Sequence, residues 1–171
     1  MAKNSVPNVF TLGNLSCGII SLLMTFQGKY MWACFFILIA GILDRYDGRL
    51  ARFLNVSSSL GKELDSLADL VSFGVAPSML VCGNFNLLEY GIIGYILILI
   101  FPIAGAYRLA RYNSTEFDGI FMGVPITAAG MFMAFYTLIT ILNKKTNSVL
   151  PILLTIMLSY LMVSKFKIKK V

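Results

Sequence analysis

Long apolar runs separated by short polar stretches make up most of the chain. A helix that crosses a bilayer needs about 20 mostly apolar residues, and six segments of the sequence meet this requirement. They lie at about 7–26, 30–53, 61–82, 87–111, 122–142 and 148–163. The polar stretches between them contain Gly, Asn and Ser, as in residues 143–148, and favour turns. The pattern predicts an all-α fold, an integral membrane bundle of six transmembrane helices.

The stretch LNVSSSLG at 54–61 is the clearest interruption of this pattern, because its asparagine, serines and glycine oppose a continuous helix. Two prolines, Pro102 and Pro125, fall within the fourth and fifth predicted helices, where a membrane bundle can accommodate them. No internal repeat divides the sequence. We therefore expect residues 1–171 to form a single membrane domain.

The composition agrees with embedding in a membrane. The chain of 171 residues is 58% hydrophobic and has a mean hydropathy of +0.81, whereas about 45–50% of the residues of a soluble domain are apolar. Its net charge of +6 is explained by basic residues that lie in cytoplasmic loops and contact anionic lipid headgroups. Because no surface pattern combines basic with aromatic residues, we expect no nucleic-acid partner.

The available side chains limit the chemistry. The chain has no histidine, so an imidazole base, nucleophile or metal ligand is excluded. Its three cysteines, Cys17, Cys34 and Cys82, are scattered through apolar stretches and lack the paired spacing of a zinc site or a disulfide framework. Any bound metal ion is therefore expected to have oxygen ligands.

The basic residues predict the orientation of the bundle, because cytoplasmic loops of membrane proteins carry an excess of Lys and Arg. If both termini are cytoplasmic, 11 of the 14 basic residues lie inside: Lys3, Arg45, Arg49, Arg52, Lys62, Arg108, Arg111, Lys165, Lys167, Lys169 and Lys170. The other 3, Lys29, Lys144 and Lys145, lie outside. We therefore expect a multi-pass protein of the cell membrane with both termini cytoplasmic.

Five of the eight acidic residues fall within 43–69, around the break between the second and third predicted helices. A carboxylate deep in a bilayer costs roughly 2.5–3.5 kcal/mol on insertion scales, so acids in such a place are functional candidates. Asp44 and Asp47 share one helix face by their spacing of three residues. Asp65 and Asp69 share another by their spacing of four. Such short oxygen ligands suit a hard divalent cation, Mg²⁺ or Mn²⁺.

Small and basic residues accompany these aspartates. Gly48 and Ala51 lie on the face of the first aspartate pair and leave room for a ligand to approach the backbone. Arg52 offers a planar pair of donors that suits phosphate. The local chemistry therefore indicates a metal ion and a phosphate. The alternative is an ion-paired interface, in which the aspartates and the neighbouring arginines meet one another or lipid headgroups.

The arrangement Asp44-x-x-Asp47-Gly48-x-x-Ala51-Arg52, followed after eight residues by Gly61-x-x-x-Asp65-x-x-x-Asp69, resembles the signature of the CDP-alcohol phosphotransferase family. The resemblance implies that the four aspartates hold one or two divalent ions. It implies that the other motif residues contact the CDP portion of a CDP-lipid; these are Gly48, Ala51, Arg52 and Gly61. It also implies that Asp69 is the catalytic general base for the attacking hydroxyl. The family's six-helix fold, usually a homodimer, would cover the whole chain.

The stretch PNVFTLGNLSCG at 7–18 resembles the N-terminal helix of the same family, which helps to form the nucleotide pocket. Asn8, Thr11 and Asn14 recur at three-residue steps and form a polar stripe. We expect this stripe to contribute to binding of the CDP-lipid. Ordinary helix capping is the alternative.

A second stretch, RLARYNSTEFDGIFMGVPITAAG at 108–130, resembles R-x-A-R-[FY]-N and F-x-G-x-P of the phosphatidylserine synthase subgroup of this family. The matching residues are Arg108, Ala110, Arg111, Tyr112, Asn113, Phe121, Gly123 and Pro125. An arginine can bind the carboxylate of serine through two parallel donors. We therefore expect Arg108, Arg111 and Asn113 to bind L-serine. The alternatives are that the arginines mark a helix end or bind the phosphate of inositol phosphate.

The function that the resemblance implies is a CDP-lipid:L-serine phosphatidyltransferase of phospholipid biosynthesis, which releases CMP at the cytoplasmic face. A phosphatidylglycerophosphate or phosphatidylinositol-phosphate synthase of the same family is the near alternative. A divalent-cation transporter is an alternative of another class, but it would distribute acids along a path through several helices. Apolar helices accommodate ester-linked and ether-linked (archaetidyl) lipid chains alike, so the sequence leaves the lipid class open.

Overall fold

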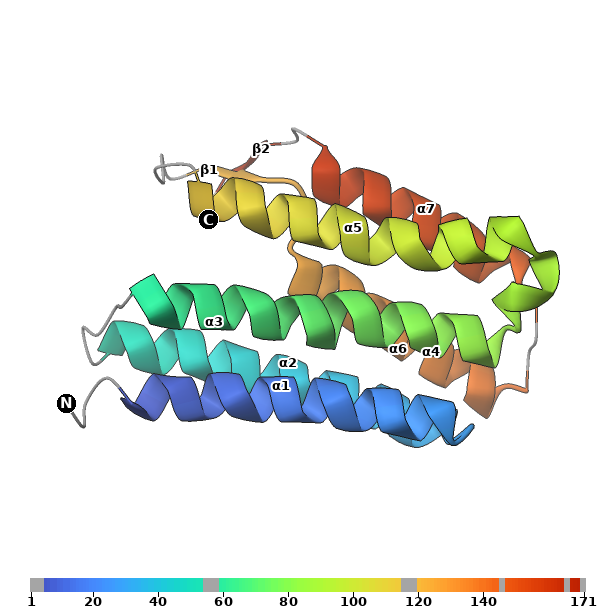
Figure 1. Cartoon of the computed structure of the whole chain (residues 1–171), viewed down its shortest axis with the longest axis horizontal. Coiled ribbons are helices and arrows are strands. Elements are labelled where there is room, and N and C mark those ends of the chain that lie inside the picture. The colour runs from blue at the N-terminus through green and yellow to red at the C-terminus, as the bar shows by residue number, and fades with distance from the viewer. Residues whose placement is uncertain (1–4, 54–58, 115–119, 145–146, 165–166, 170–171) are drawn as a thin grey trace.

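The computed structural model describes residues 5–53, 59–114, 120–144, 147–164 and 167–169. These residues contain six long helical segments, one at each predicted place (Figure 1). They are α1 (Ser5–Phe26), α2 (Tyr30–Phe53), the rod α3–η2–α4 (Ser59–Asp69, Leu70–Val75 and Ala76–Asn84), α5 (Ile92–Ser114), α6 (Ile126–Leu142) and α7 (Val149–Val163). A short 3-10 turn, η3 (Leu87–Tyr90), precedes α5. The prediction of a helical bundle is confirmed.

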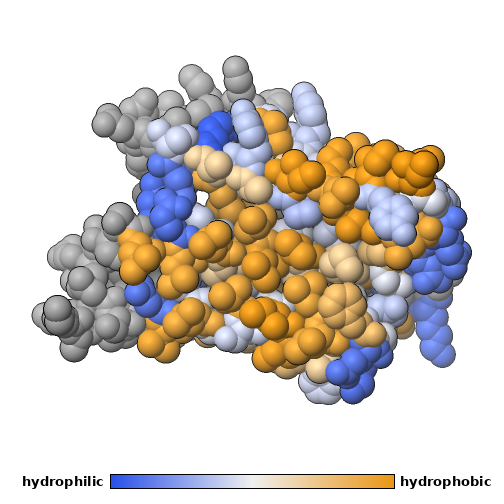
Figure 2. Space-filling model, in the orientation of Figure 1, coloured by the Kyte–Doolittle hydropathy of each residue, from blue (hydrophilic) through white to orange (hydrophobic). Residues whose placement is uncertain are grey.

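The helices have the length and the apolar surface expected of helices in a membrane. By length and composition three of them can cross a membrane, namely Asn8–Phe26, Leu60–Asn84 and Ile92–Ser114. The helices α6 and α7 are also apolar but have only 17 and 15 residues. Large apolar side chains are exposed on every long helix, and Figure 2 shows a broad hydrophobic surface over the helical body. Because a water-soluble protein rarely exposes such a continuous apolar surface, these features identify a membrane protein.

Two groups of helices make up the bundle (Figure 1). The helices α1 and α2 pack together beside the α3–α4 rod, and α5 packs on α7. The helix α6 contacts α2, α4 and α7 and so joins the two groups. The apolar core contains side chains that are almost completely buried: Ile37, Phe73, Leu80, Phe101, Ile126 and Met133. This core holds the polar residues of the site in fixed positions.

A π-helical segment, η2, begins directly after Asp69. Glycines allow two neighbouring helices to approach it closely. A methyl group at Gly18 of α1 would collide with Ser72, and one at Gly130 of α6 would collide with the backbone of Phe73. The helices α1 and α6 therefore constrain the backbone that follows Asp69. Short π-helical segments within α-helices are frequent at functional sites.

The sequence predicted helices only, and the structure adds one small sheet to them. The strands β1 (Ile120–Met122) and β2 (Lys167–Lys169) pair antiparallel. Gly123 follows β1 with a φ of 74°, and a side chain there would collide with the backbone carbonyl of Met162. Strands become readable from alternation over about four to eight residues, so strands of three residues gave no usable pattern.

Candidate active site

Three aspartates from two helices meet in the bundle. One carboxylate oxygen each from Asp44 on α2 and from Asp65 and Asp69 on α3 lie within 4.8 Å of one another. Asp69 is buried, with 8% of its surface exposed, and the other two are half-buried. The side chain of Asp47, the fourth predicted ligand, lies outside the described residues. The structure thus brings the two acidic segments together, close enough for their oxygens to share one cation.

Two further helices hold the carboxylate of Asp69. Nδ2 of Asn14 on α1 donates to Asp69 Oδ1 at 3.1 Å. Oγ1 of Thr127 on α6 donates to Asp69 Oδ2 at 3.4 Å, a weak contact that is longer than the usual range of about 2.5–3.0 Å for a hydroxyl donor. Asn14 is itself fixed, because Ser72 Oγ donates to its backbone carbonyl at 3.0 Å. Each oxygen of Asp69 therefore has a described donor, and α1 and α6 together orient this carboxylate.

Thr127 was not among the residues singled out in the sequence. Its signal there is weak, because it is one of three threonines in an apolar helix, two positions after Pro125. Threonine is common in membrane helices, where its hydroxyl usually bonds within its own helix. Only the packing of α6 against η2 brings Thr127 to Asp69.

The polar stripe of α1 faces the interior of the bundle. Asn14 is fully buried, Thr11 is 3% exposed, and Asn8 is half-buried. Oδ1 of Asn14 is buried and has no hydrogen-bond partner among the described residues. Because buried polar atoms are normally hydrogen-bonded, this amide oxygen beside Asp69 is an acceptor suited to a bound ligand.

The donors at this site fit a hard divalent cation. The group contains carboxylates only, and the chain has no histidine to add a nitrogen ligand. Oxygen ligands of this kind are typical of Mg²⁺, Mn²⁺ and Ca²⁺. Gathering three carboxylates in a partly buried place is costly unless a positive charge compensates them. The residues present therefore fit a metal ion on chemical and electrostatic grounds.

There is open space beside the carboxylates. Gly48 lies one turn after Asp44 and is exposed, and a methyl group added to it would have no atom within 4 Å. Gly61, near the start of α3, is half-buried. The side chains of Ala51 and Arg52, in the last turns of α2, lie outside the described residues. A ligand can thus approach the backbone of α2 at Gly48.

Arg108, the first of the predicted serine-binding residues, lies near Asp69 of the carboxylate cluster. Its side chain is buried, with 8% of its surface exposed, and its guanidinium interacts electrostatically with Asp69. Its Nε is buried and has no hydrogen-bond partner among the described residues. A buried guanidinium with an unused donor is a favourable partner for an anionic ligand.

The other two predicted serine-binding residues also contact neighbouring helices. Nη1 of Arg111 donates to the carbonyl of Val163 on α7 at 3.0 Å. Nδ2 of Asn113 donates to Ser66 Oγ of α3 at 2.9 Å and to Glu63 Oε1 at 3.4 Å. Oδ1 of Asn113 is buried and without a partner among the described residues. Asn113 therefore lies against the helix that carries Asp65 and Asp69, whereas Arg111 lies against α7.

Comparison with known proteins shows similarity to one family of enzymes. The family model described as CDP-alcohol phosphatidyltransferase matches residues 4–164. A Bacillus subtilis (strain 168) protein named CDP-diacylglycerol–serine O-phosphatidyltransferase is 40% identical over 165 residues, which cover 96% of this chain and 89% of that protein. A protein of the same name from Helicobacter pylori (strain J99) is 38% identical over 136 residues, 78% of this chain and 57% of that protein. Another from Methanocaldococcus jannaschii is 34% identical over 167 residues, 97% of this chain and 74% of that protein.

Proposed function

Because the chain belongs to the CDP-alcohol phosphatidyltransferase family, we propose that it is a CDP-lipid:L-serine phosphatidyltransferase. The serine hydroxyl oxygen forms a bond to the lipid-side phosphorus of the CDP-lipid. The bond from that phosphorus to the oxygen of CMP breaks, and CMP leaves. The product is a phosphatidylserine-type lipid. The similarity to relatives named for the serine reaction, over most of this chain, supports serine as the acceptor.

The observation that carries the proposal is the meeting of Asp44, Asp65 and Asp69 within 4.8 Å. These residues, together with Asp47, would hold one or two divalent cations, Mg²⁺ or Mn²⁺. When bound, such a cation neutralises charge on the pyrophosphate and on the departing CMP. Positioning and charge stabilisation make up most of the catalysis of phosphoryl transfer, so a fixed cluster of this kind suits the reaction.

Asp69 is the proposed general base. A serine hydroxyl is a weak nucleophile, and a carboxylate within hydrogen-bonding distance can accept its proton as the new bond forms. The hydrogen bonds from Asn14 and Thr127 support this role, because they orient both oxygens of Asp69. A base held in this way needs little rearrangement when the substrate binds.

The donor lipid is proposed to lie along α2 and α1. The open space beside Gly48 supports close approach of the CDP portion to α2. Ala51, Arg52 and Gly61 are proposed contacts of the same portion. The polar stripe of α1 (Asn8, Thr11 and Asn14) faces the interior of the bundle. This position supports the proposal that the stripe forms one polar side of the nucleotide site.

The serine pocket is proposed to lie next to Asp69, with Arg108 bound to the serine carboxylate. The buried Arg108 Nε, which has no described partner, supports this assignment. Oδ1 of Asn113, which has no partner among the described residues, is a suitable acceptor for the serine ammonium. Arg111 is the third proposed contact. Its Nη1 donates to α7, so we expect it to bind serine less strongly than Arg108 does.

We further propose that both termini and the active site lie at the cytoplasmic face of the cell membrane. The excess of basic residues at that face, 11 against 3 of the 14, supports this orientation. Figure 1 shows the start of α1 and the strand β2 at the same end of the bundle, as this orientation requires. Soluble serine would then meet the membrane-bound donor at one surface. A homodimer is proposed from the family resemblance.

The test is CMP release by purified, folded protein in detergent with CDP-lipid and Mg²⁺. Serine, glycerol phosphate and inositol phosphate are offered separately. Release with serine alone is the expected result. Release with another alcohol only would keep the family and overturn the serine assignment. Release with none of them would contradict the proposed reaction and favour the alternative of a divalent-cation transporter. Against that alternative, the described helices α5 to α7 contain no acidic residue that could line a path for a cation.

A further inference from the structure

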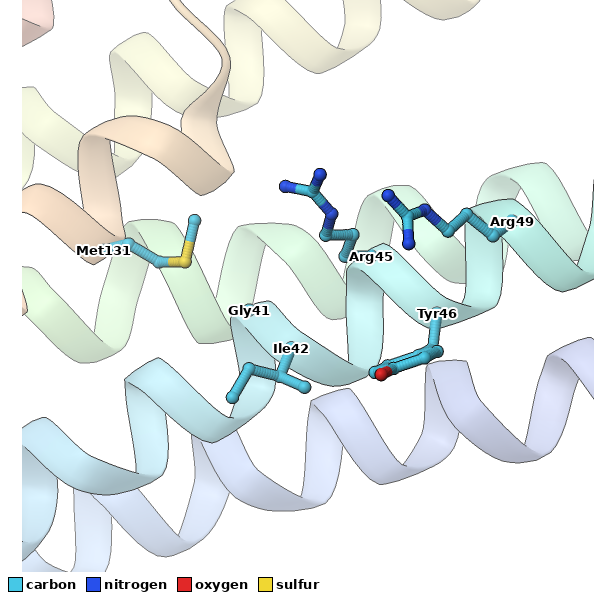
Figure 3. A pocket seen from close by; sticks show the side chains of 6 residues that line it. All are labelled: Gly41, Ile42, Arg45, Tyr46, Arg49 and Met131. Carbon is cyan, nitrogen blue, oxygen red and sulfur yellow. The ribbon is translucent and has the colours of Figure 1, made fainter.

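A pocket of about 330 Å³ opens between α2 and α6 (Figure 3). Its lining comes from five residues of α2 and one of α6: Gly41, Ile42, Arg45, Tyr46, Arg49 and Met131. In Figure 3 the side chains of Arg45 and Arg49 extend from successive turns of α2 in the same direction. None of the lining residues belongs to the carboxylate cluster or to the proposed substrate contacts.

The donors of the two arginines in this pocket have no partner in the part of the chain that the structure describes. Both side chains are exposed, and neither makes a hydrogen bond or an ion pair with any other residue that the structure describes. A guanidinium on the surface of a membrane helix is costly unless its head reaches the headgroup region. There, its planar donors match the oxygens of a phosphate. The pair is therefore suited to the phosphate of a lipid.

The pocket changes from apolar to basic along α2. This gradient is complementary to a phospholipid, which changes from apolar chains to an anionic phosphate. Gly41 and Ile42 lie one turn before Arg45, next to the part of α2 at 30–43, which has no charged residue. Met131 of α6 closes this apolar end, and its side chain contacts the face of Gly41. Both arginines lie toward the charged end of α2. A lipid with its phosphate at the arginines would therefore direct its chains toward the apolar end.

The pocket and the carboxylates occupy different faces of α2. Successive helical residues are about 100° apart, so Arg45 lies about that far around the axis from Asp44, and Arg49 lies about that far from Gly48. The pyrophosphate of the donor belongs to the carboxylate face under the proposed function. Two positive charges without a partner among the described residues also favour a lipid of net negative charge over one whose headgroup carries its own cation.

We propose that the Arg45–Arg49 pocket binds an anionic phospholipid of the surrounding membrane, a ligand distinct from the CDP-lipid donor. The lipid phosphate lies against the two guanidiniums, and one acyl chain lies against Ile42 and Met131. This site goes beyond the phosphatidyltransferase reaction and does not depend on it. It gives the protein a preference for anionic lipid at the end of the bundle where the basic residues gather.

Native mass spectrometry of protein released from micelles that contain phosphatidylglycerol or phosphatidylcholine tests the proposal. The variant Arg45→Gln/Arg49→Gln is compared with the wild type. Its charge-matched control is Lys29→Gln/Lys144→Gln, at exposed positions in the turns after α1 and α6. The wild type and the control are expected to retain phosphatidylglycerol more than phosphatidylcholine. The arginine variant should lose retention of phosphatidylglycerol by about fivefold for each charge removed.

A second variant, Ile42→Trp, keeps both charges and fills the apolar end of the pocket, so it should lower retention as well. Thermal unfolding of each variant shows whether it is folded. If the double arginine variant is unfolded, retention of phosphatidylglycerol by Ile42→Trp tests the proposal instead. Equal retention of both lipids by the wild type would overturn the proposal, as would equal losses in the arginine variant and its control. Displacement of phosphatidylglycerol by CDP-lipid, one for one, would assign the pocket to the donor instead. These readouts do not require turnover, so the proposed reaction can fail without affecting them.

Discussion

Asn14 on α1 donates a hydrogen bond from Nδ2 to Oδ1 of Asp69 on α3, at 3.1 Å and across 55 positions of sequence. The amide is buried and fixed through its own backbone by Ser72. It therefore holds one oxygen of the proposed base in place and leaves the carboxylate plane little freedom. The polar stripe of α1 thus contacts the acidic cluster itself, in addition to its proposed role in the nucleotide pocket.

Replacement of Asn14 by alanine is expected to slow CMP release by about tenfold, the equivalent of about 1.4 kcal/mol, because a hydrogen bond to a charged group is lost. Initial rates with saturating CDP-lipid and serine measure the effect. Ser16→Ala is the control, because the hydroxyl of Ser16 is exposed and donates only to the carbonyl of Leu12 in its own helix. Equal rates for the two variants would show that Asn14 does not orient Asp69.

The contact between Thr127 and Asp69 is longer, at 3.4 Å, and its effect should be smaller. Thr127→Val keeps the shape of the side chain but removes the donor, so turnover should fall by roughly twofold to tenfold. Thr127→Ser keeps the hydroxyl and should stay close to the wild type. Rates for the two variants, measured beside each other, distinguish the hydroxyl from the packing of the methyl group. Equal losses in both variants would argue for packing alone.

The close approach of α6 to the π-helical segment should make Gly130 sensitive to any side chain. A methyl group there would overlap the backbone of Phe73, so Gly130→Ala should lower the free energy of unfolding by about 1–3 kcal/mol. Thermal unfolding in detergent reports this change. Gly48→Ala is the matched control, because the added methyl would have no atom within 4 Å. That variant should unfold like the wild type but bind CDP-lipid more weakly.

Substitution of Arg108 should change the KM for serine and not the KM for the donor lipid. Arg108→Gln removes the charge that is proposed to bind the serine carboxylate, so the KM for serine should rise by roughly tenfold to hundredfold. The KM for CDP-lipid should stay the same. Arg111→Gln should raise the KM for serine less, because Arg111 also donates to the carbonyl of Val163. A rise in the KM for CDP-lipid, with that for serine unchanged, would place Arg108 at the donor.

Much of the fold was predictable from the sequence, because a helix in a membrane needs an uninterrupted apolar run. The start of α2 at Tyr30 and the ends of α1 and α6 at Phe26 and Leu142 agree with the predicted positions. The π-helical segment at Leu70–Val75 was not predicted, since a shift of backbone hydrogen bonds within an apolar stretch leaves no change in the pattern. The strands at 120–122 and 167–169 were too short to alternate.

The site was predictable where local spacing determines it. Helical periodicity placed Asp65 and Asp69 on one face, and the structure brings them to Asp44. The contact from Thr127 could not be predicted, because it joins residues 58 positions apart through the packing of whole helices. The same holds for Asn113, whose bond to Ser66 links α5 to α3. Contacts of this kind depend on which helices are neighbours, and periodicity within one helix does not contain that information.

The central claim is that the carboxylates of Asp44, Asp65 and Asp69 bind a divalent cation on which serine transfer depends. The most direct measurement is CMP release with CDP-lipid and serine after chelation, as Mg²⁺ or Mn²⁺ is added back to the wild type and to Asp44→Asn. We expect no release in chelator and full recovery in the wild type. We expect the variant to need a metal concentration about tenfold higher or more for half-maximal release. Release that is indifferent to chelation, or equal metal dependence in the two proteins, would contradict the claim.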